Sequence, residues 1–578
     1  MQFDKKTVIA FLLLGAVLLL VQTPFYQKTF FPNAYRARME RKQQKELMPQ
    51  AEEEQIEDIP QEPEPAETKR SEAQVTPKTS RFNRVDSSEP EKVIHIETRL
   101  YTAVLSSRGA SLSQFILKAF PGPDGTPVKL LPPESTGTFG VSFFTIDGDT
   151  VDTFDWMFTV NSPSTIDMGK EQSKTVTFTY NIAADQRIVK VFRFYQDRYD
   201  FDLDITFENL EQIIAEKRYI ISAPSGLAST EHRLKDDMMY AKAGISSAGS
   251  VSKNYRPNNR LYQEDGTIDW VGVKTKYFAL MMQPKERKGI QAWIAGAEFQ
   301  LDPMEKAKWK RFSIALVMPF LSDRTVHDRF MIYLGPQDYA LLKDYGVGLE
   351  KFMDMGMKLI QPISQIVLWS FKKLHTVIPN YGVVLIIFAI LVKIIVYPLT
   401  HKSFESMKKM QTLQPKLTEL REKYGSDPQR LNKETMKLYK ESGVNPLGSC
   451  LPMVLQMPLL FALFNVFRTT IELRGEGFVF WIKDLSMPDT VATLPFSLPI
   501  YGDAVNILPL FMGATMLIQQ KMSSTDPKQK AMVYMMPIFL TLLFNSFPSG
   551  LNLYYALFNI MSIIQQKITS TPGVVAKK

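Results

Sequence analysis

The chain has little of what metalloproteins and most enzymes are built from. It holds one cysteine, Cys450, among 578 residues. This excludes an intramolecular disulfide framework and a cysteine-built zinc or iron–sulfur site. Its five histidines are scattered and form no HExxH pair. A GxxxxGK[ST] loop and a strand-linked GxGxxG are also missing, so no nucleotide-driven motor is predicted. We therefore expect no metal, no cofactor and no nucleotide.

What the chain does have is a strong segregation of polar and apolar residues. The averages, 45% hydrophobic residues and a formal charge of +8, would fit an ordinary soluble protein. Residues 7–21, TVIAFLLLGAVLLLV, follow Lys5 and Lys6 without an A-x-A-like cleavage site. Extended through Tyr26, the segment reaches about 20 residues, enough to span a bilayer. We interpret 1–27 as an uncleaved signal anchor, with a removed signal peptide as the alternative.

Residues 50–89 are acidic, rich in proline and poor in aromatics, and we predict a disordered tether over 28–90. Residues 91–335 then alternate polar and apolar side chains, with turn signals between the segments. The strand-like segments are LYTAVL (100–105), TVTFTYNIA (175–183), IVKVFRFY (188–195) and FDLDITFEN (201–209). This pattern predicts a large all-β sandwich. His95, His232 and His327 have acidic neighbours in sequence, so catalysis in this domain is one hypothesis.

The region 336–378 is predicted to hold an amphipathic helix. Lys351, Lys358, Gln365 and Lys372 recur every seven residues, with apolar residues on the other side. Such a helix suits a membrane surface, and the alternative is a helix packed on the β domain.

Five long apolar segments follow, at 379–400, 449–468, 505–520, 531–547 and 551–567. With the anchor they make six predicted membrane spans. Basic residues dominate 401–448, the loop 521–530 and the tail 568–578, whereas the loop 469–504 is mainly acidic. The positive-inside rule then places both termini in the cytoplasm and the β domain outside. The basic residues just after the first span suggest the opposite orientation, and the other loops outweigh them.

The basic loop 401–448 has helical structure of its own. Phe404, Met407, Met410, Leu413, Leu417 and Leu420 form one apolar stripe. Asp427 is a candidate N-cap before Pro428, and Gly443 can end the second helix. The sequence thus predicts a basic helical hairpin.

Lys393 lies within an apolar span, roughly 9 Å along the helix from Leu399. A charge at that depth faces a polar cavity or partner, or extends to the nearby surface. Polar residues in the later spans favour a hydrated groove holding one positive charge. These residues are Gln456, Asn465, Gln519, Gln520, Asn545, Asn552 and Asn559.

Taken together, the motifs resemble the YidC/Oxa/Alb family of membrane protein insertases. The matching stretches are YPLT (397–400), LQPKL (413–417), VNPLGSCLP (444–452), QMP (456–458), WIKDLS (481–486), FPSGLNLYY (547–555) and IIQQ (563–566). The architecture before residue 350 is similar to the Gram-negative form, whose periplasmic β sandwich is similar to sugar-mutarotase folds.

The resemblance implies a polytopic α-helical inner-membrane protein with a five-helix core and a large periplasmic domain, and no enzymatic activity. It implies a groove residue at Lys393, where the family usually has Arg, with Gln456, Met457 and Tyr555 as further groove residues. The hairpin residues Lys408, Lys409, Lys416, Arg421 and Lys423 would contact ribosome and client. Implied partners are nascent membrane proteins, the ribosome, the Sec translocon and the lipid bilayer. Two alternatives remain at this point: a small-solute secondary transporter, and an envelope enzyme anchored by its spans.

Overall fold

The computed structural model describes residues 90–570, except 134, 136, 254, 301–307, 322, 426, 445–450, 499–500 and 524–529. The predicted anchor (1–27), the tether (28–90) up to residue 89, and most of the tail and of the loop 521–530 lie outside the described residues. The described chain forms two compact units. We call residues 90–368 with 461–474 the β unit, and residues 369–460 with 475–570 the helical unit.

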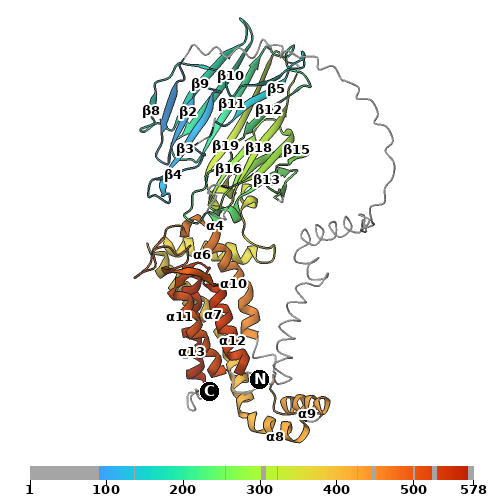
Figure 1. Ribbon diagram of the computed structural model, residues 1–578, viewed down its shortest axis with the longest axis vertical. Helices are drawn as coiled ribbons and strands as arrows, with labels where there is room; N and C mark the ends of the chain where they lie inside the picture. The colour runs from blue at the N-terminus through green and yellow to red at the C-terminus, as the bar shows by residue number, and fades with distance from the viewer. Residues whose placement is uncertain are drawn as a thin grey trace, which may run out of the picture. The chain divides into compact units, whose positions relative to one another are not determined.

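Two sheets make up most of the β unit (Figure 1). The smaller sheet has, in spatial order, β4 (Pro127–Lys129), β3 (Ser111–Pro121), β2 (Tyr101–Ser106), β1 (Val93–Glu97) and β8 (Thr165–Asp167). The larger sheet has β6 (Thr150–Asp152), β5 (Gly140–Phe144), β12 (Arg218–Ala223), β18 (Lys308–Pro319), β17 (Gly289–Gln300), β15 (Leu261–Lys274), β16 (Phe278–Pro284), β19 (Thr325–Pro336), β11 (Asp200–Glu208), β10 (Arg187–Tyr195), β9 (Ser173–Asn181) and β7 (Thr159–Val160), with β13 (Lys242–Ser247) and β14 (Ser250–Ser252) attached beside β15.

The sheets pack as a sandwich because alternate side chains of each strand point into one shared core. In β10, Ile188, Phe192 and Phe194 are fully buried. Rings from the two sheets meet there. The ring centres of Tyr101 and Phe194 lie 6.4 Å apart, and those of Phe115 and Phe201 also lie 6.4 Å apart. The four strands read from the sequence are confirmed as β2, β9, β10 and β11.

One cation lies inside this core. Lys190 of β10 is fully buried and donates hydrogen bonds to the carbonyls of Gly109, Ala110 and Phe139. All three acceptor residues have positive φ angles, of 70°, 43° and 69°. Burial lowers the pKa of Lys190 to about 7. Three carbonyls on left-handed backbone thus surround the ammonium group, and we call Gly109, Ala110 and Phe139 the cradle.

Short helices connect the strands to the rest of the chain: α4 (Leu234–Tyr240), α5 (Tyr339–Asp344), η1 (Leu349–Phe352) and α6 (Gln361–His375). The amphipathic helix predicted within 336–378, on the lysines and Gln365 between Lys351 and Lys372, is interrupted over 353–360, where the chain leaves the helix. Gly356 has a φ of +91°, and a Cβ there would lie 2.3 Å from Nδ2 of Asn465. The positive φ at Gly356 is incompatible with a right-handed helix, and the missing Cβ leaves room for Asn465.

The β unit also includes the end of α10 (Leu451–Thr469) and the short helix η3 (Ile471–Leu473). Ile471 packs in the sandwich core. Arg474 donates from Nε to Glu231 at 2.9 Å and from Nη2 to the carbonyl of Thr230 at 3.1 Å. The Arg474 and Glu231 side chains are only 8% and 10% exposed, so the pair is largely dehydrated. An apolar contact and a buried ion pair thus fasten this segment to the sandwich.

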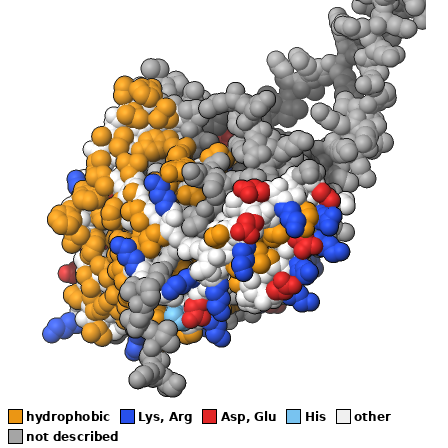
Figure 2. Space-filling model, turned by 90° about the horizontal axis from the view of Figure 1, so that it is seen from below, with side chains coloured by type: hydrophobic (Ala, Val, Ile, Leu, Met, Phe, Trp, Pro, Cys, Tyr) orange, Lys and Arg blue, Asp and Glu red, His pale blue; other side chains and the backbone are white. Residues whose placement is uncertain are grey.

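The helical unit contains α7 (Tyr381–Thr412), α8 (Gln414–Tyr424), α9 (Pro428–Glu441), the first part of α10, α11 (Ile507–Ser523), α12 (Lys530–Phe544) and α13 (Ser549–Ser570). By length and composition, α7 is the one helix in the described ranges that is long and apolar enough to cross a membrane, and Val533–Phe544 is a shorter apolar helix. Exposed apolar side chains cover these helices, and Figure 2 shows a broad hydrophobic surface beside an area of mixed charge. They include Ile390, Ile394 and Ile395 of α7, Phe511 and Ile518 of α11, and Ile538 and Phe539 of α12.

Two features of this unit differ from a simple reading of the sequence. The helix that holds Lys393 does not end near residue 400 but runs on to Thr412 despite Pro398. The segment 469–504, read as a loop, contributes strand β20 (Thr490–Leu498), which pairs with β21 (Gly502–Asn506). Alternation is weak in TVATLPFSL, and its Pro495 argues against a strand, which is why the sequence did not indicate this hairpin.

Candidate functional site

Lys393 lies in the interior of the helical unit, on the thirteenth residue of α7. Asn380 caps the start of α7, because its side chain accepts a hydrogen bond from the N–H of Val383. Lys393 is 7% exposed, although the neighbouring Ile394 and Ile395 are exposed. The helical period therefore turns the charged residue inward and its apolar neighbours outward.

Neutral groups of α13 hold the ammonium of Lys393. Its Nζ donates to Oγ of Ser562 at 2.7 Å and lies 4.6 Å from the ring centre of Phe558. Ser562 in turn donates to the carbonyl of Phe558. Within the described chain, no carboxylate forms an ion pair with Lys393. The positive charge is therefore solvated by a hydroxyl and an aromatic face, and it is not neutralised.

Further polar contacts join the same helices along their length. Thr400 of α7 and Gln565 of α13 exchange hydrogen bonds of 3.3 and 3.1 Å. On another side of α13, Asn559 donates to Thr515 of α11 at 3.3 Å. These pairs satisfy buried polar groups between helices, as expected for a membrane bundle. They also create a polar seam along α13 on either side of Lys393.

Proline removes one helical hydrogen-bond donor near the charge. Pro398 has no N–H, so the carbonyl of Ile394 lacks its helical donor. This carbonyl belongs to the residue directly after Lys393. Pro458 in α10 and Pro537 in α12 have the same effect on their own helices. Such freed groups are tolerated at membrane depth where protein or water satisfies them.

The other predicted groove residues lie on two further elements. Gln456 and Met457 are on α10, where Gln456 is half-buried and Met457 is 48% exposed. Tyr555 is on α13, seven residues before Ser562 and so on the same face of that helix. Its hydroxyl is buried without a hydrogen-bond partner among the described atoms. In the described part of the chain, no hydrogen bond joins Lys393 to Gln456, Met457 or Tyr555. The role of these three residues stays a prediction.

The predicted contact residues of the hairpin divide between helices. Lys408 and Lys409 belong to α7, and Lys408 donates to the carbonyl of Thr569 of α13 at 3.5 Å. Lys416, Arg421 and Lys423 lie on α8. The Asp427 cap is confirmed, because its side chain accepts from the N–H groups of Gln429 and Arg430, and Gly443 follows α9 with a φ of +62°.

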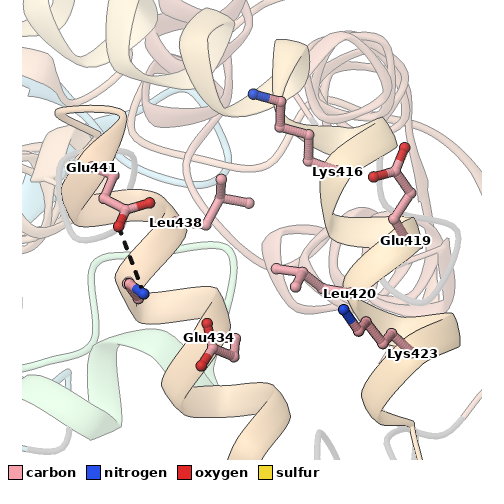
Figure 3. Close-up of a pocket in the computed structure, with 8 residues that line it drawn as sticks. Lys416, Glu419, Leu420, Lys423, Glu434, Leu438 and Glu441 are labelled. Carbon is pink, nitrogen blue, oxygen red and sulfur yellow. Dashed lines mark ion pairs between the residues drawn. The ribbon is translucent and has the colours of Figure 1, made fainter.

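A cavity of about 340 Å³ separates α8 from α9. Figure 3 shows lysines and glutamates of both helices around it, with one leucine on each side. The ion pair drawn there joins Lys437 to Glu441 within α9, at 4.0 Å. The lining residues are Lys416, Glu419, Leu420 and Lys423 of α8, and Glu434, Lys437, Leu438 and Glu441 of α9.

The sequence analysis did not predict a segment that closes the ends of two helices, α11 and α13. Within residues 475–489, one carboxylate oxygen of Asp489 accepts from the indole of Trp481 and from the N–H groups of Ile507 and Leu508, which begin α11. Ser549, which begins α13, donates to the carbonyl of Met487 at 2.7 Å. We call residues 475–489 the closing segment. An aspartate followed eighteen residues later by the helix it caps gives no local signal, which explains the omission.

Comparisons with known proteins match nearly the whole described chain. Residues 93–370 match the family described as the YidC periplasmic domain, and residues 373–575 match the 60Kd inner membrane protein family. The chain is 37% identical over 505 residues to the membrane protein insertase YidC of Prosthecochloris aestuarii, covering 85% of each chain. It is 38% identical to that of Chlorobium phaeovibrioides, covering 82% of each. Among solved structures, an active YidC insertase with its first transmembrane domain resolved matches at 19% identity and a TM-score of 0.35, over 84% of this chain and 95% of the other. The chain therefore belongs to the YidC family of inner-membrane proteins with a periplasmic domain.

Proposed function

We propose that this protein inserts other membrane proteins into the inner membrane and assists their folding, without forming or breaking a covalent bond. The relatives that it matches over more than four fifths of its length are named membrane protein insertases. Those names favour neither the transporter nor the envelope enzyme. The observation that carries the mechanism is Lys393, a buried cation held by neutral groups.

Lys393 receives the polar part of a client while the client's apolar part enters the lipid. Transfer of a polar segment through hydrocarbon is costly because its groups lose their hydration. A cation that is held by a serine and a phenylalanine keeps its field, so it attracts carbonyls and carboxylates of the incoming chain. Gln456, Met457 and Tyr555 line the rest of this path. The exposed apolar side chains of α7, α11 and α12 face lipid.

The topology that goes with this function has six spans: the N-terminal anchor and the helices α7, α10, α11, α12 and α13. Both termini and the α8–α9 hairpin are cytoplasmic, and the β unit is periplasmic. The ribosome and the client are contacted by Lys408, Lys409, Lys416, Arg421 and Lys423. Insertion proceeds alone or beside the Sec translocon.

The test is insertion into liposomes that contain only the purified protein. A small client with two short spans is added without nucleotide or ion gradient, and protease protection of its loop is scored. Lys393→Glu should abolish protection, because it replaces an attractive field with a repulsive one. Lys393→Arg should retain most of it, because the charge is kept.

Lys402→Glu is the matched control, since it makes the same charge change on an exposed position of the same helix. It should leave protection unchanged. Full protection with Lys393→Glu would refute the role of Lys393. No protection with the unaltered protein would refute autonomous insertion.

A further inference from the structure

The closing segment carries an aromatic turn that points away from the protein. The N–H of Phe478 donates to the carbonyl of Ile482 at 2.9 Å, and the N–H of Ile482 donates to the carbonyl of Val479 at 3.3 Å. This tight turn presents Val479, Phe480 and Trp481. Phe480 is 90% exposed, and its two neighbours are also exposed. Three consecutive apolar side chains therefore lie on the surface of one turn.

The backbone conformation of Phe480 and the exposure of its ring are both unfavourable. Its φ is +58°, in the left-handed region that a bulky aromatic residue rarely adopts. Its ring gains almost no burial from the rest of the chain in return. Glycine or asparagine would adopt this φ with less strain. Strained backbone that presents a side chain to the outside indicates that the side chain has a use there.

Contacts of the same turn place it at the ends of membrane helices. Phe478 packs against Gly382, the second residue of α7, where an added Cβ would meet its ring at 2.0 Å. The indole of Trp481 donates to Asp489, which caps the start of α11. The apolar part of α7 starts at this same end. The ends of membrane helices lie at the membrane–water interface, which is where tryptophan and other aromatic side chains are enriched.

We propose that Val479, Phe480 and Trp481 form an interfacial anchor whose occupant is the phospholipid of the periplasmic leaflet. Phe480 inserts at the boundary between headgroups and acyl chains, and the left-handed turn holds its ring out of the protein. The anchor fixes the depth of the closing segment, and with it the ends of α7 and α11. The assignment to the periplasmic leaflet rests on the topology proposed above. The anchoring itself does not depend on client insertion, so a protein that fails to insert clients would still show it.

Depth measurements on the full chain test the proposal. Cys450 is replaced by serine, and a spin label is attached at Phe480→Cys in liposomes of phosphatidylcholine and phosphatidylglycerol. The ratio of collisions with oxygen to collisions with a water-soluble nickel chelate reports lipid contact. Ile395→Cys on α7, 78% exposed, is the lipid reference. Ile146→Cys, 63% exposed in the turn between β5 and β6, is the water reference.

The ratio at 480 should lie several-fold above that at 146 and approach that at 395. A ratio equal to that at 146 would overturn the proposal. Should Phe480→Cys fail to fold, Val479→Cys carries the label. With the label at 479, adding Phe480→Asn should shift the ratio toward water, whereas Phe480→Trp should not. An unchanged ratio with Phe480→Asn would show that the ring has no anchoring role.

Discussion

Replacing Lys190 with methionine tests whether the amino group of this side chain stabilises the cradle in the sandwich core. Methionine keeps much of the side-chain volume but leaves three buried carbonyls without a donor. Two of the lost bonds, to Gly109 and Phe139, measure 2.8 Å, and the third, to Ala110, measures 3.3 Å. An unsatisfied buried acceptor costs about 1–3 kcal/mol, and removal of the buried charge offsets part of the sum. We expect a loss of about 3–5 kcal/mol in the free energy of unfolding of the β unit.

The effect should depend on pH with a definite sign. Burial lowers the pKa of Lys190 from 10.5 to about 7. Between these values the unfolded chain binds more protons than the folded chain, so the contribution of Lys190 to stability rises with pH. Methionine has no such contribution. The gap between the two proteins should therefore widen by up to about 1.4 kcal/mol per pH unit above pH 7.

Urea denaturation of the full chain in detergent, followed by tryptophan fluorescence at pH 7 and pH 9, measures both effects. Lys129→Met in β4 is the control, because it removes an exposed lysine and should change stability by less than about 0.5 kcal/mol. A loss below about 1 kcal/mol for Lys190→Met, or a gap that does not grow with pH, would refute the reasoning.

Three further outcomes follow from contacts described above. Glu231→Gln and Arg474→Met should each cost about 3 kcal/mol and the double variant less than their sum, measured as faster amide exchange in η3. If the losses of the two single variants simply add in the double variant, Glu231 and Arg474 do not interact directly. Asp489→Ala should lower the free energy of unfolding by about 1–2 kcal/mol, because the cap of α11 is lost. It should also make residues 475–489 sensitive to protease. An unchanged digestion pattern would show that Asp489 does not hold the closing segment in place. Asp427→Ala should cost about 1 kcal/mol and speed exchange in the first turn of α9 only; loss of the whole hairpin would contradict a local cap.

The elements that the sequence predicts correctly are those whose signals lie within one short stretch of residues. The alternation in IVKVFRFY gave β10, and Asp427 before Pro428 gave the start of α9, because each signal lies within the element that it forms. Lys393 stood out because a charge within an apolar run is anomalous wherever its partner lies.

What the sequence did not predict depends on residues that are far apart. Ser562 contacts Lys393 across 169 positions, and a serine within a helix gives no sign of such a partner. Asp489 caps a helix from a distant turn, and Gly356 leaves room for Asn465, which is far from it in sequence. The lysine in the sandwich core appeared as one more polar residue of a strand, since its carbonyl acceptors exist only once the sheets are packed.

The continuity of α7 has a mechanical consequence. One helix of 32 residues, about 48 Å long, carries Lys393 in its apolar part and the base of the hairpin at its other end. Since each residue adds about 100° of rotation, a single-residue insertion between Pro398 and Lys408 would turn the hairpin by roughly that angle relative to Lys393. A rotation at one end of a helix is passed along to its other end. Pro398 is the position where α7 bends most easily. A force on the hairpin would therefore reach Lys393 as a rotation of α7. Bending at Pro398 would reduce that rotation.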